Sequence, residues 1–276
     1  MRSTAFVKLP EHTIEDHIPG KSGDERDANM EKLFRNFLDN RDKDMPFFSF
    51  MFLDAPHAPY RFPKDFEKFK PVVEEVNYFH VKKSGSEVNQ NHPLFNRYRN
   101  AIYFDDSVVG RIINDIKDAG QMDNTVIVIT GDHGEEFFES GYYGHNTTFS
   151  SWQAQVPFIL YVPGLKPHKI DRLTSHLDLA PTMLSLIGIS TDPSSYSQGM
   201  SLLDNKEHPY VIISGWDTFA MVDKDAAIVL STESYNAGMS EVRIGNYAIA
   251  EDPRTIIKAK MGQLAEVTRN LGYFLK

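Results

Sequence analysis

The sequence predicts an α/β layered fold, in which strands and helices alternate along most of the chain. Three observations predict it: short apolar runs that suit buried strands, one-sided helical patterns between them, and two hairpin patterns near the carboxyl end. With 276 residues, the chain is long enough to bury the core of one or two domains. We expect an irregular amino-terminal segment over residues 1–23 and one partial domain over residues 24–276.

The sequence of the first half of this domain predicts two helices that flank a strand and a long loop. Residues 24–40 carry apolar side chains at helical spacing. The run 46–54 is apolar on both faces, as in a central strand covered by helices. Residues 55–96 are rich in Pro, Asn, Lys and His and predict a functional loop or lid. A helix over 97–119 should follow. The expected buried positions of the two helices are Met30, Leu33, Phe34, Phe37 and Leu38, then Ile102, Val109, Ile112, Ile113 and Ile116.

The second half alternates further strands with short helices. The clearest strand is 125–131, whose β-branched residues indicate burial on both faces. A second strand is expected at 156–162, and Asp178 can cap a helix that ends at Gly188. The remaining elements are a strand at 210–214, hairpins over 219–230 and 241–249, and a helix from Arg254 with Ile257, Met261, Leu264, Leu271 and Phe274 buried.

Composition excludes several classes of function. The formal net charge of −9 argues against a nucleic-acid partner, because such proteins normally carry a basic stripe. The absence of cysteine excludes disulfides, thiolate zinc sites and cysteine nucleophiles. No apolar run approaches the roughly 20 residues that cross a bilayer. Residues 1–20 hold charges and prolines where a signal peptide needs an apolar stretch. We therefore expect no targeting or membrane segment in this chain.

The strongest chemical signal is the motif Gly-Asp-His-Gly-Glu-Glu over residues 131–136, directly after the predicted strand. Ligand sites in open α/β sheets collect beyond the carboxyl ends of strands. Asp132 and His133 offer a carboxylate oxygen and an imidazole nitrogen, which suit a divalent metal ion. The flanking glycines allow a tight turn that brings the two side chains together. An ordinary capping Asp and surface His is the alternative.

Two further histidines are candidates for contacts with substrate. His145 lies in a Gly- and Tyr-rich loop, and it can bind an oxyanion, protonate a leaving group, or only hydrogen-bond within its loop. His57 follows the strand predicted at 46–54, between two prolines, so it should open onto the same edge of the sheet. A structural role under the long loop is the alternative for His57. If these histidines act together, both should point into one cleft with Asp132 and His133.

Other polar residues favour structural roles. We expect Asp178 to cap its helix and His176 to be a hydrogen-bond partner within its loop. Of Asp105 and Asp106, one should face the core and bond to loop backbone while the other faces water. The lysines at 64, 68, 70, 82 and 83 can form a basic patch, for which a solvated surface is the better interpretation. Covalent catalysis on an ester would need a nucleophile, such as a Ser or Thr at a strand-to-helix turn. No Ser or Thr lies at such a turn upstream of the motif, so we assign no nucleophile.

Several stretches, taken in order, resemble the sulfatase branch of the alkaline phosphatase superfamily. They are FFSFMFLDAPHAPYRFP, NRYRNAIYFDDSVVG, NTVIVITGDHGEEF, GHNTTFSSWQAQVPFILYVPG and TSHLDLAPTMLSLIGI. The stretch SSYSQGMSLLD and the GHN loop are similar, more narrowly, to the YejM (PbgA) group of inner-membrane, sulfatase-like proteins. The likeness runs from about residue 24 to the end of the chain.

The resemblance implies a three-layer α/β/α sandwich with a mostly parallel central sheet, to which the late hairpins are appended. It implies a place at the periplasmic face of the inner membrane and a role in the homeostasis of lipopolysaccharide and outer-membrane lipids. Lipid A, another anionic lipid and membrane proteins are the implied partners. Asp132 and His133 match the metal-binding pair of the family, and His57 and His145 match its substrate-side histidines. The metal, whether Mg, Mn, Zn or Ca, is not distinguished.

Compared with the family pattern, the sequence starts after the membrane helices, the first core strand and the segment of the nucleophile. We therefore expect a module that binds lipid or protein, with a metal-dependent hydrolase or transferase of phosphate or sulfate esters as the alternative. We expect negligible turnover from the chain alone. We also expect it to be marginally stable, aggregation-prone or self-associating, because runs such as 47–53 and 126–129 are built for burial on both faces.

Overall fold

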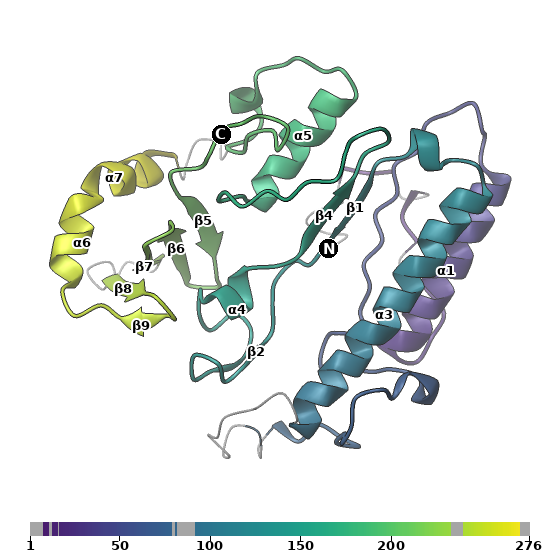
Figure 1. Ribbon diagram of the computed structural model, residues 1–276, viewed down its shortest axis with the longest axis horizontal. Helices are drawn as coiled ribbons and strands as arrows, with labels where there is room; N and C mark the ends of the chain where they lie inside the picture. The colour runs from purple at the N-terminus through teal and green to yellow at the C-terminus, as the bar shows by residue number, and fades with distance from the viewer. Residues whose placement is uncertain are drawn as a thin grey trace. The chain divides into compact units, whose positions relative to one another are not determined.

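The computed structural model describes residues 8–10, 13–15, 17–78, 81, 92–232 and 240–270 (Figure 1). The chain forms two compact units, Met1–Val128 with Leu160–Leu165, and Ile129–Ile159 with Lys166–Lys276. The division runs through strands β1 (Ile127–Thr130) and β4 (Phe158–Tyr161), which pair with each other in a two-stranded sheet. Both strands were predicted, but neither is buried on both faces. The side chains of β1 are half-buried or exposed, and those of β4 alternate between half-buried and exposed.

The first unit is built on two long helices that pack side by side, α1 (Gly23–Asn40) and α3 (Pro93–Asp118) (Figure 1). The predicted helices are confirmed, with α3 beginning earlier because Pro93 occupies its first turn and His92 caps it. The predicted stripe of α3 is confirmed at Ile112 and Ile116. Ile102 is exposed, and Ala101, Phe104 and Val108 face the core instead of it. The core joins α3 to α1 through Phe34, Leu38, Ala55, Phe104, Val108, Ile112 and Ile116.

Buried charges also join the two helices. Arg35 of α1 contacts Asp115 of α3 at 2.7 Å and Glu31 at 3.1 Å, and both carboxylates are buried. One turn away from this group, Asp27 is fully buried and hydrogen-bonds to Asp105. The periodic apolar pattern predicted the helices but gave no sign of these polar contacts within their interface.

The segment expected as a strand over 46–54 has no regular secondary structure and belongs to no sheet in the described part of the chain. Phe47, Met51 and Leu53 pack against the core of the first unit, whereas Phe48 and Phe50 are exposed. An apolar run predicts an extended backbone, yet a strand also needs a partner with which to form hydrogen bonds. The prediction of a buried strand was therefore wrong for the described structure.

The loop after this segment is held by buried side chains of α3. Tyr60 is fully buried and makes an edge-on contact with Tyr98, with ring centroids 5.4 Å apart. Arg97 donates through Nε to the carbonyl of Pro59 at 2.8 Å and through Nη1 to that of Val73 at 2.9 Å. The short 3₁₀ helices of this unit are η2 (Lys64–Phe66) and η3 (Met122–Asn124). Residues 79–80 and 82–91 of the predicted loop lie outside the described residues.

The second unit begins with a compact polar segment. It consists of the antiparallel strands β2 (Glu136–Phe137) and β3 (Tyr143–Gly144), followed by helix α4 (Ser151–Ala154). Farther along come η4 (His176–Asp178), α5 (Leu179–Leu186) and η5 (Pro193–Ser195). The predicted helix after Asp178 is confirmed, but Ile187 is two-thirds exposed because the helix turns only Pro181 and Thr182 fully inward.

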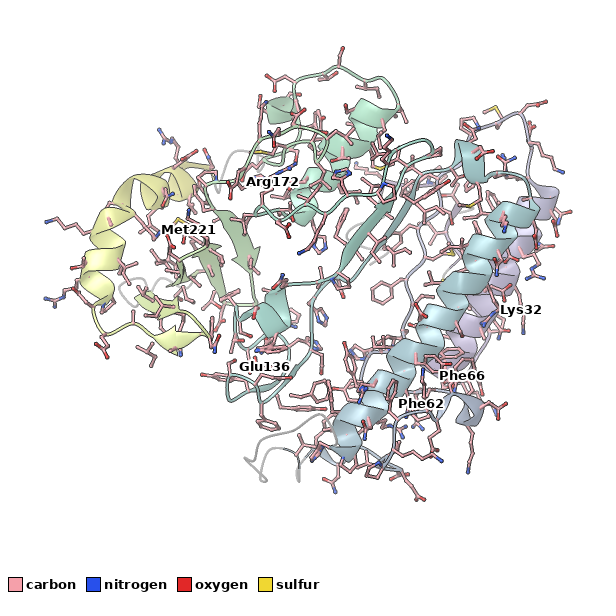
Figure 2. The ribbon with its side chains drawn as sticks, in the orientation of Figure 1. Lys32, Phe62, Phe66, Glu136, Arg172 and Met221 are labelled. Atoms are coloured by element: carbon pink, nitrogen blue, oxygen red, sulfur yellow. The ribbon has the colours of Figure 1, made fainter. Side chains whose placement is uncertain are left out.

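The largest sheet is antiparallel and has the strand order β5-β6-β7-β8-β9. The strands are β5 (Val211–Ser214), β6 (Thr218–Val222), β7 (Ala226–Ser231), β8 (Ser240–Ile244) and β9 (Ala248–Ile249). Both predicted hairpins are thus confirmed. The helices α6 (Pro253–Ala259) and α7 (Met261–Asn270) divide the single predicted helix at Lys260. Met221, labelled in Figure 2, packs with Ile228 and with Val267 of α7 in the core of this sheet. Leu271 and Phe274 lie outside the described residues.

The structure confirms the predicted α/β class together with the late β-hairpins. Among the described residues, the sheet expected at the centre is limited to β1 and β4. No helix of the described chain has the length and apolarity that a membrane span requires.

Candidate metal centre

The turn after β1 carries the candidate ligands, and its geometry depends on glycine. The amide of Gly134 donates to the carbonyl of Gln153 at 2.9 Å, which brings the turn against α4. A Cβ atom at position 134 would lie 2.0 Å from the carbonyl oxygen of Trp152. Gly134 is therefore required by the close approach of two backbones.

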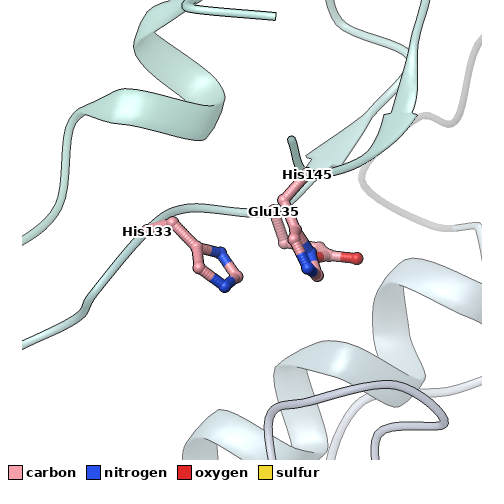
Figure 3. A group of neighbouring side chains, drawn as sticks. All are labelled: His133, Glu135 and His145. Atoms are coloured by element: carbon pink, nitrogen blue, oxygen red, sulfur yellow. The ribbon is translucent and has the colours of Figure 1, made fainter. Parts of the chain in front are cut away.

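Three side chains converge beyond this turn. His133, Glu135 and His145 each offer one ligand atom, and these atoms all lie within 4.8 Å of one another. The two imidazole rings stack with their centroids 4.0 Å apart, and Glu135 lies beside His145 (Figure 3). Two imidazoles and a carboxylate form a donor set that suits Zn²⁺ and other first-row divalent ions. The residues therefore fit a divalent metal ion.

Neighbouring groups orient each ring. Nδ1 of His133 lies 2.9 Å from the carbonyl of Gly134, to which it donates, so Nε2 is the nitrogen left to bind a metal. Nδ1 of His145 lies 2.7 Å from Oε2 of Glu135. This hydrogen bond raises the pKa of His145 above its usual value, against the opposing effect of partial burial.

Asp132 lies beside this cluster rather than within it. Its Oδ2 is 3.7 Å from Nε2 of His133, and its side chain is largely exposed. Its other oxygen, Oδ1, accepts the amide of His133 at 3.0 Å. Asp132 and His133 thus follow the strand as expected, and their joint binding of a metal stays a prediction.

A buried carboxylate underlies the loop of His145. Glu136 is fully buried (Figure 2) and accepts hydrogen bonds from six donors in the segment 140–153. Burial alone would raise its pKa, but the hydrogen bonds from Ser140 and Gln153 outweigh that effect and lower the pKa. Glu136 is therefore a buried anion that is stabilised by neutral donors.

His57 lies in the first unit, whereas His133 and His145 belong to the second. Its Nδ1 is 3.0 Å from the carbonyl of Ala58, and its side chain is exposed. The backbone beneath it is fixed because Asp27 accepts the amides of Asp54 at 2.9 Å and of Ala55 at 2.6 Å. His57 and His145 belong to different units, and their convergence in one cleft stays a prediction.

The residues given structural roles occupy structural positions. Asp178 does not cap α5 as expected, because its side chain makes no cap hydrogen bond there. It is buried, completes the capping box of η4 with Ser175, and lies 2.7 Å from Nε2 of His208. His176, at the start of η4, lies 3.2 Å from the hydroxyl of Thr130 at the end of β1, so its hydrogen-bond partner lies outside its own loop, where we had expected it.

The tandem acids and the lysines also match their structural interpretations. Asp105 is buried and Asp106 is exposed, although Asp27, and not Asp105, binds the loop backbone. Lys64, Lys68 and Lys70 are exposed, and Lys82 and Lys83 lie outside the described residues.

Glu135 and Glu136 were missed as individual site residues. The sequence signal was present, because two acids directly follow the Asp-His pair in the motif. Their different roles follow from strand β2, in which Glu136 is buried, while Glu135 remains beside His145. Gln153 carried no recognisable signal, since its role depends on the approach of α4 to the turn.

The family model described as Sulfatase matches residues 5–189, which is more than half of the chain. The inner membrane protein YejM of Salmonella typhi is 27% identical over 159 residues, covering 56% of this chain and 27% of that protein. The lipoteichoic acid synthase-like protein YvgJ of Bacillus subtilis is 28% identical over 138 residues, covering 46% of this chain and 22% of that protein. The chain therefore spans about a quarter of the length of these relatives.

Solved structures show the same fold. A candidate sulfatase, yidJ, from Bacteroides fragilis has a TM-score of 0.61 at 20% identity and covers 92% of this chain and 58% of its own. A protein of the alkaline phosphatase superfamily from Vibrio parahaemolyticus has a TM-score of 0.52 at 18% identity and covers 86% and 51%. The predicted superfamily is confirmed.

Proposed function

The chain belongs to the sulfatase family, and we propose that it is the metal-binding part of a membrane-associated protein that binds anionic lipid. The observation that carries this proposal is the convergence of His133, Glu135 and His145 beyond β1. We further propose a place at the periplasmic face of an inner membrane and a role in outer-membrane lipid homeostasis, which the relationship to YejM supports.

The chemistry of the cluster favours a phosphorylated lipid head group, such as that of lipid A, as its ligand. A divalent ion held by three protein ligands keeps at least one open position. A phosphate oxygen can occupy that position, since hard oxygen donors and divalent cations attract each other strongly. The metal supplies positive charge beside the carboxylates of Asp132, Glu135 and Glu136.

Metal titrations can distinguish two overlapping ligand sets. Co²⁺ bound to the structural cluster needs Glu135 and His145, whereas the pair predicted from the sequence needs Asp132 and His133. We expect Glu135→Gln and His145→Ala to reduce Co²⁺ affinity at least tenfold, and Asp132→Asn to change it less than threefold. The reverse order would assign the metal to Asp132 and His133. Absence of Co²⁺, Zn²⁺ and Mn²⁺ binding by the unmodified chain would refute the proposed metal site.

Lipid binding is tested separately by co-sedimentation with vesicles. Phosphatidylcholine vesicles with and without lipid A are compared, each with Zn²⁺ and with EDTA. We expect retention only with both lipid A and metal, and loss of retention for His145→Ala. Binding that is equal with EDTA would show that the lipid is recognised elsewhere, and binding to neither vesicle would refute the lipid proposal.

The second candidate function is a metal-dependent hydrolase or transferase of phosphate or sulfate esters. Its specific support is Asp132, an exposed carboxylate 3.7 Å from Nε2 of His133, which places a fourth potential ligand beside the three of the cluster. Turnover of aryl sulfates and aryl phosphates with each divalent metal decides between the two. A metal-dependent rate that Asp132→Ala abolishes would establish the enzyme and displace the binding module.

A further inference from the structure

His145 belongs to a polar loop whose two sides are joined by one buried carboxylate. Oε1 of Glu136 accepts the amide of Ser140 at 2.8 Å, its hydroxyl at 2.5 Å and the amide of Tyr142 at 3.2 Å. All three donors precede His145 in the chain. The other oxygen, Oε2, accepts donors that follow His145. They are the hydroxyls of Thr148 at 3.3 Å and Ser150 at 3.0 Å, and Nε2 of Gln153 at 2.9 Å.

Gln153 extends this arrangement to the other ligand-bearing segment. Its Oε1 accepts the amides of Thr147 and Thr148, each at 3.1 Å. Its backbone carbonyl accepts the amide of Gly134, which lies between His133 and Glu135 in the chain. One residue of α4 therefore contacts both the loop of His145 and the turn that carries the other two ligands.

A tyrosine of the large sheet contacts the same loop from a distant part of the chain. The hydroxyl of Tyr247 accepts the amide of Phe149 at 2.8 Å. Tyr247 lies in the β8–β9 turn at a φ of +65°, and its own carbonyl accepts Nη1 of Arg243 at 3.2 Å. The guanidinium of Arg243 also lies over the tyrosine ring, 5.0 Å from its centroid. These contacts with Arg243 fix the position of Tyr247, independently of its hydrogen bond to the loop.

We infer that Glu136 and Tyr247 are positioning residues for the metal centre, although neither belongs to the ligand cluster. Glu136 fixes the loop on both sides of His145, and Tyr247 makes the carboxyl-terminal sheet a support of that loop. Residues behind the ligands typically change metal affinity by about 10- to 100-fold. The inference is tested by two measurements. The first, metal affinity, rests on the proposed metal site, whereas the second, amide hydrogen exchange of the metal-free protein, depends only on the hydrogen bonds of the loop.

The first measurement is Co²⁺ affinity together with the visible spectrum of the bound ion. Glu136→Gln keeps the shape of the side chain but places an amide group against existing donors, so we expect about a 10- to 100-fold loss of affinity and an altered spectrum. Tyr247→Phe removes one hydroxyl and should cost less, about threefold to tenfold. Val267→Ala, in the core of the same unit, is the control that lowers stability without contacting the loop.

A double variant tests the specific contact between Glu136 and Gln153. In Glu136→Gln with Gln153→Glu, the amide and carboxylate exchange places, so the amide of residue 136 can donate to residue 153. The carboxylate at 153 still accepts the amides of Thr147 and Thr148. We expect the double variant to recover most of the lost Co²⁺ affinity. A double variant as weak as Glu136→Gln alone would overturn the assigned contact.

The second measurement needs no metal. Amide hydrogen exchange of the metal-free protein should become at least tenfold faster over residues 140–149 in Glu136→Gln and stay unchanged in β6 and β7. Unchanged exchange in the loop would overturn the positioning role even if Co²⁺ binds. Faster exchange in a chain that binds no Co²⁺ would retain the positioning role and refute only the proposed metal site.

Discussion

The contact between Asp27 and Asp105 should make the first unit less stable as the pH rises. Both carboxyls are buried between α1 and α3. Burial, followed by the charge of Asp27 and its hydrogen bond, raises the pKa of Asp105 to about 8, and Asp54 and Asp24 act in the same direction. One of these acids, Asp54, is paired with Arg26 at 2.5 Å. Asp105 therefore keeps its proton in the folded chain and donates it to Asp27.

The sign of the effect follows from proton binding. The folded state holds a proton that the unfolded state releases near the ordinary pKa of 3.8. Stability is thus greatest below that value, falls as pH rises toward about 8, and then levels off. The slope cannot exceed about 1.4 kcal/mol per pH unit for one proton, and the full span from 3.8 to about 8 is worth at most roughly 6 kcal/mol. The pair titrates jointly, because the pKa of Asp27 is raised as well.

Asp105→Asn tests this account, with Asp106→Asn as the matched control from the exposed side of the same helix. The amide of Asn can donate to Asp27 as the protonated acid does, but it does not titrate. Urea unfolding is followed by circular dichroism at 222 nm, because α1 and α3, with 18 and 26 residues, hold most of the described helix. We expect the unmodified chain and Asp106→Asn to lose stability between pH 5 and 8, and Asp105→Asn to lose clearly less. Equal slopes for all three proteins would refute the reasoning.

Three further outcomes are expected. Gly134→Ala should weaken Co²⁺ binding by more than tenfold in titrations, since the added Cβ would lie 2.0 Å from the carbonyl of Trp152. Gly110→Ala is the control, and it should leave Co²⁺ binding unchanged because Gly110 has open space around it. The chain alone should show no measurable hydrolysis of aryl sulfate or phosphate in steady-state assays with any divalent metal, and a metal-dependent rate would contradict this. Phe48→Ser should reduce self-association in sedimentation velocity experiments without lowering the unfolding midpoint, because Phe48 is 86% exposed, and an unchanged association constant would exclude this residue from the contact.

Local sequence patterns predicted correctly those elements whose signals come from neighbouring residues. Both long helices, the two hairpins and the strand before the motif were all found, since periodicity and turn residues are properties of neighbouring positions. The segment 46–54 was not, because an apolar run cannot reveal whether a partner strand is present. The first part of the stripe of α3 was displaced toward Phe104 and Val108 for a similar reason, since a helix can turn any of several apolar faces toward its neighbour.

The site was predictable to the level of the motif and no further. Asp132 and His133 stood out because they follow a strand, and His145 because of its glycine-rich loop. The polar support of that loop, formed by Glu136, Gln153 and Tyr247, joins residues up to 111 positions apart, and no spacing rule connects them. Likewise, the buried contact of Asp27 with Asp105 depends on how two helices pack, which a single sequence does not specify.

The close approach of α4 to the Gly134 turn also gives the protein an optical reporter. Trp152 contributes the carbonyl at that approach, and its indole is half exposed. The chain has only one other tryptophan, Trp216, whose side chain is 88% exposed in the turn between β5 and β6. A Trp216→Phe variant would therefore leave a single emitter next to the ligand turn. Quenching of that emission by Co²⁺ would make occupancy of the centre visible in solution without an attached dye.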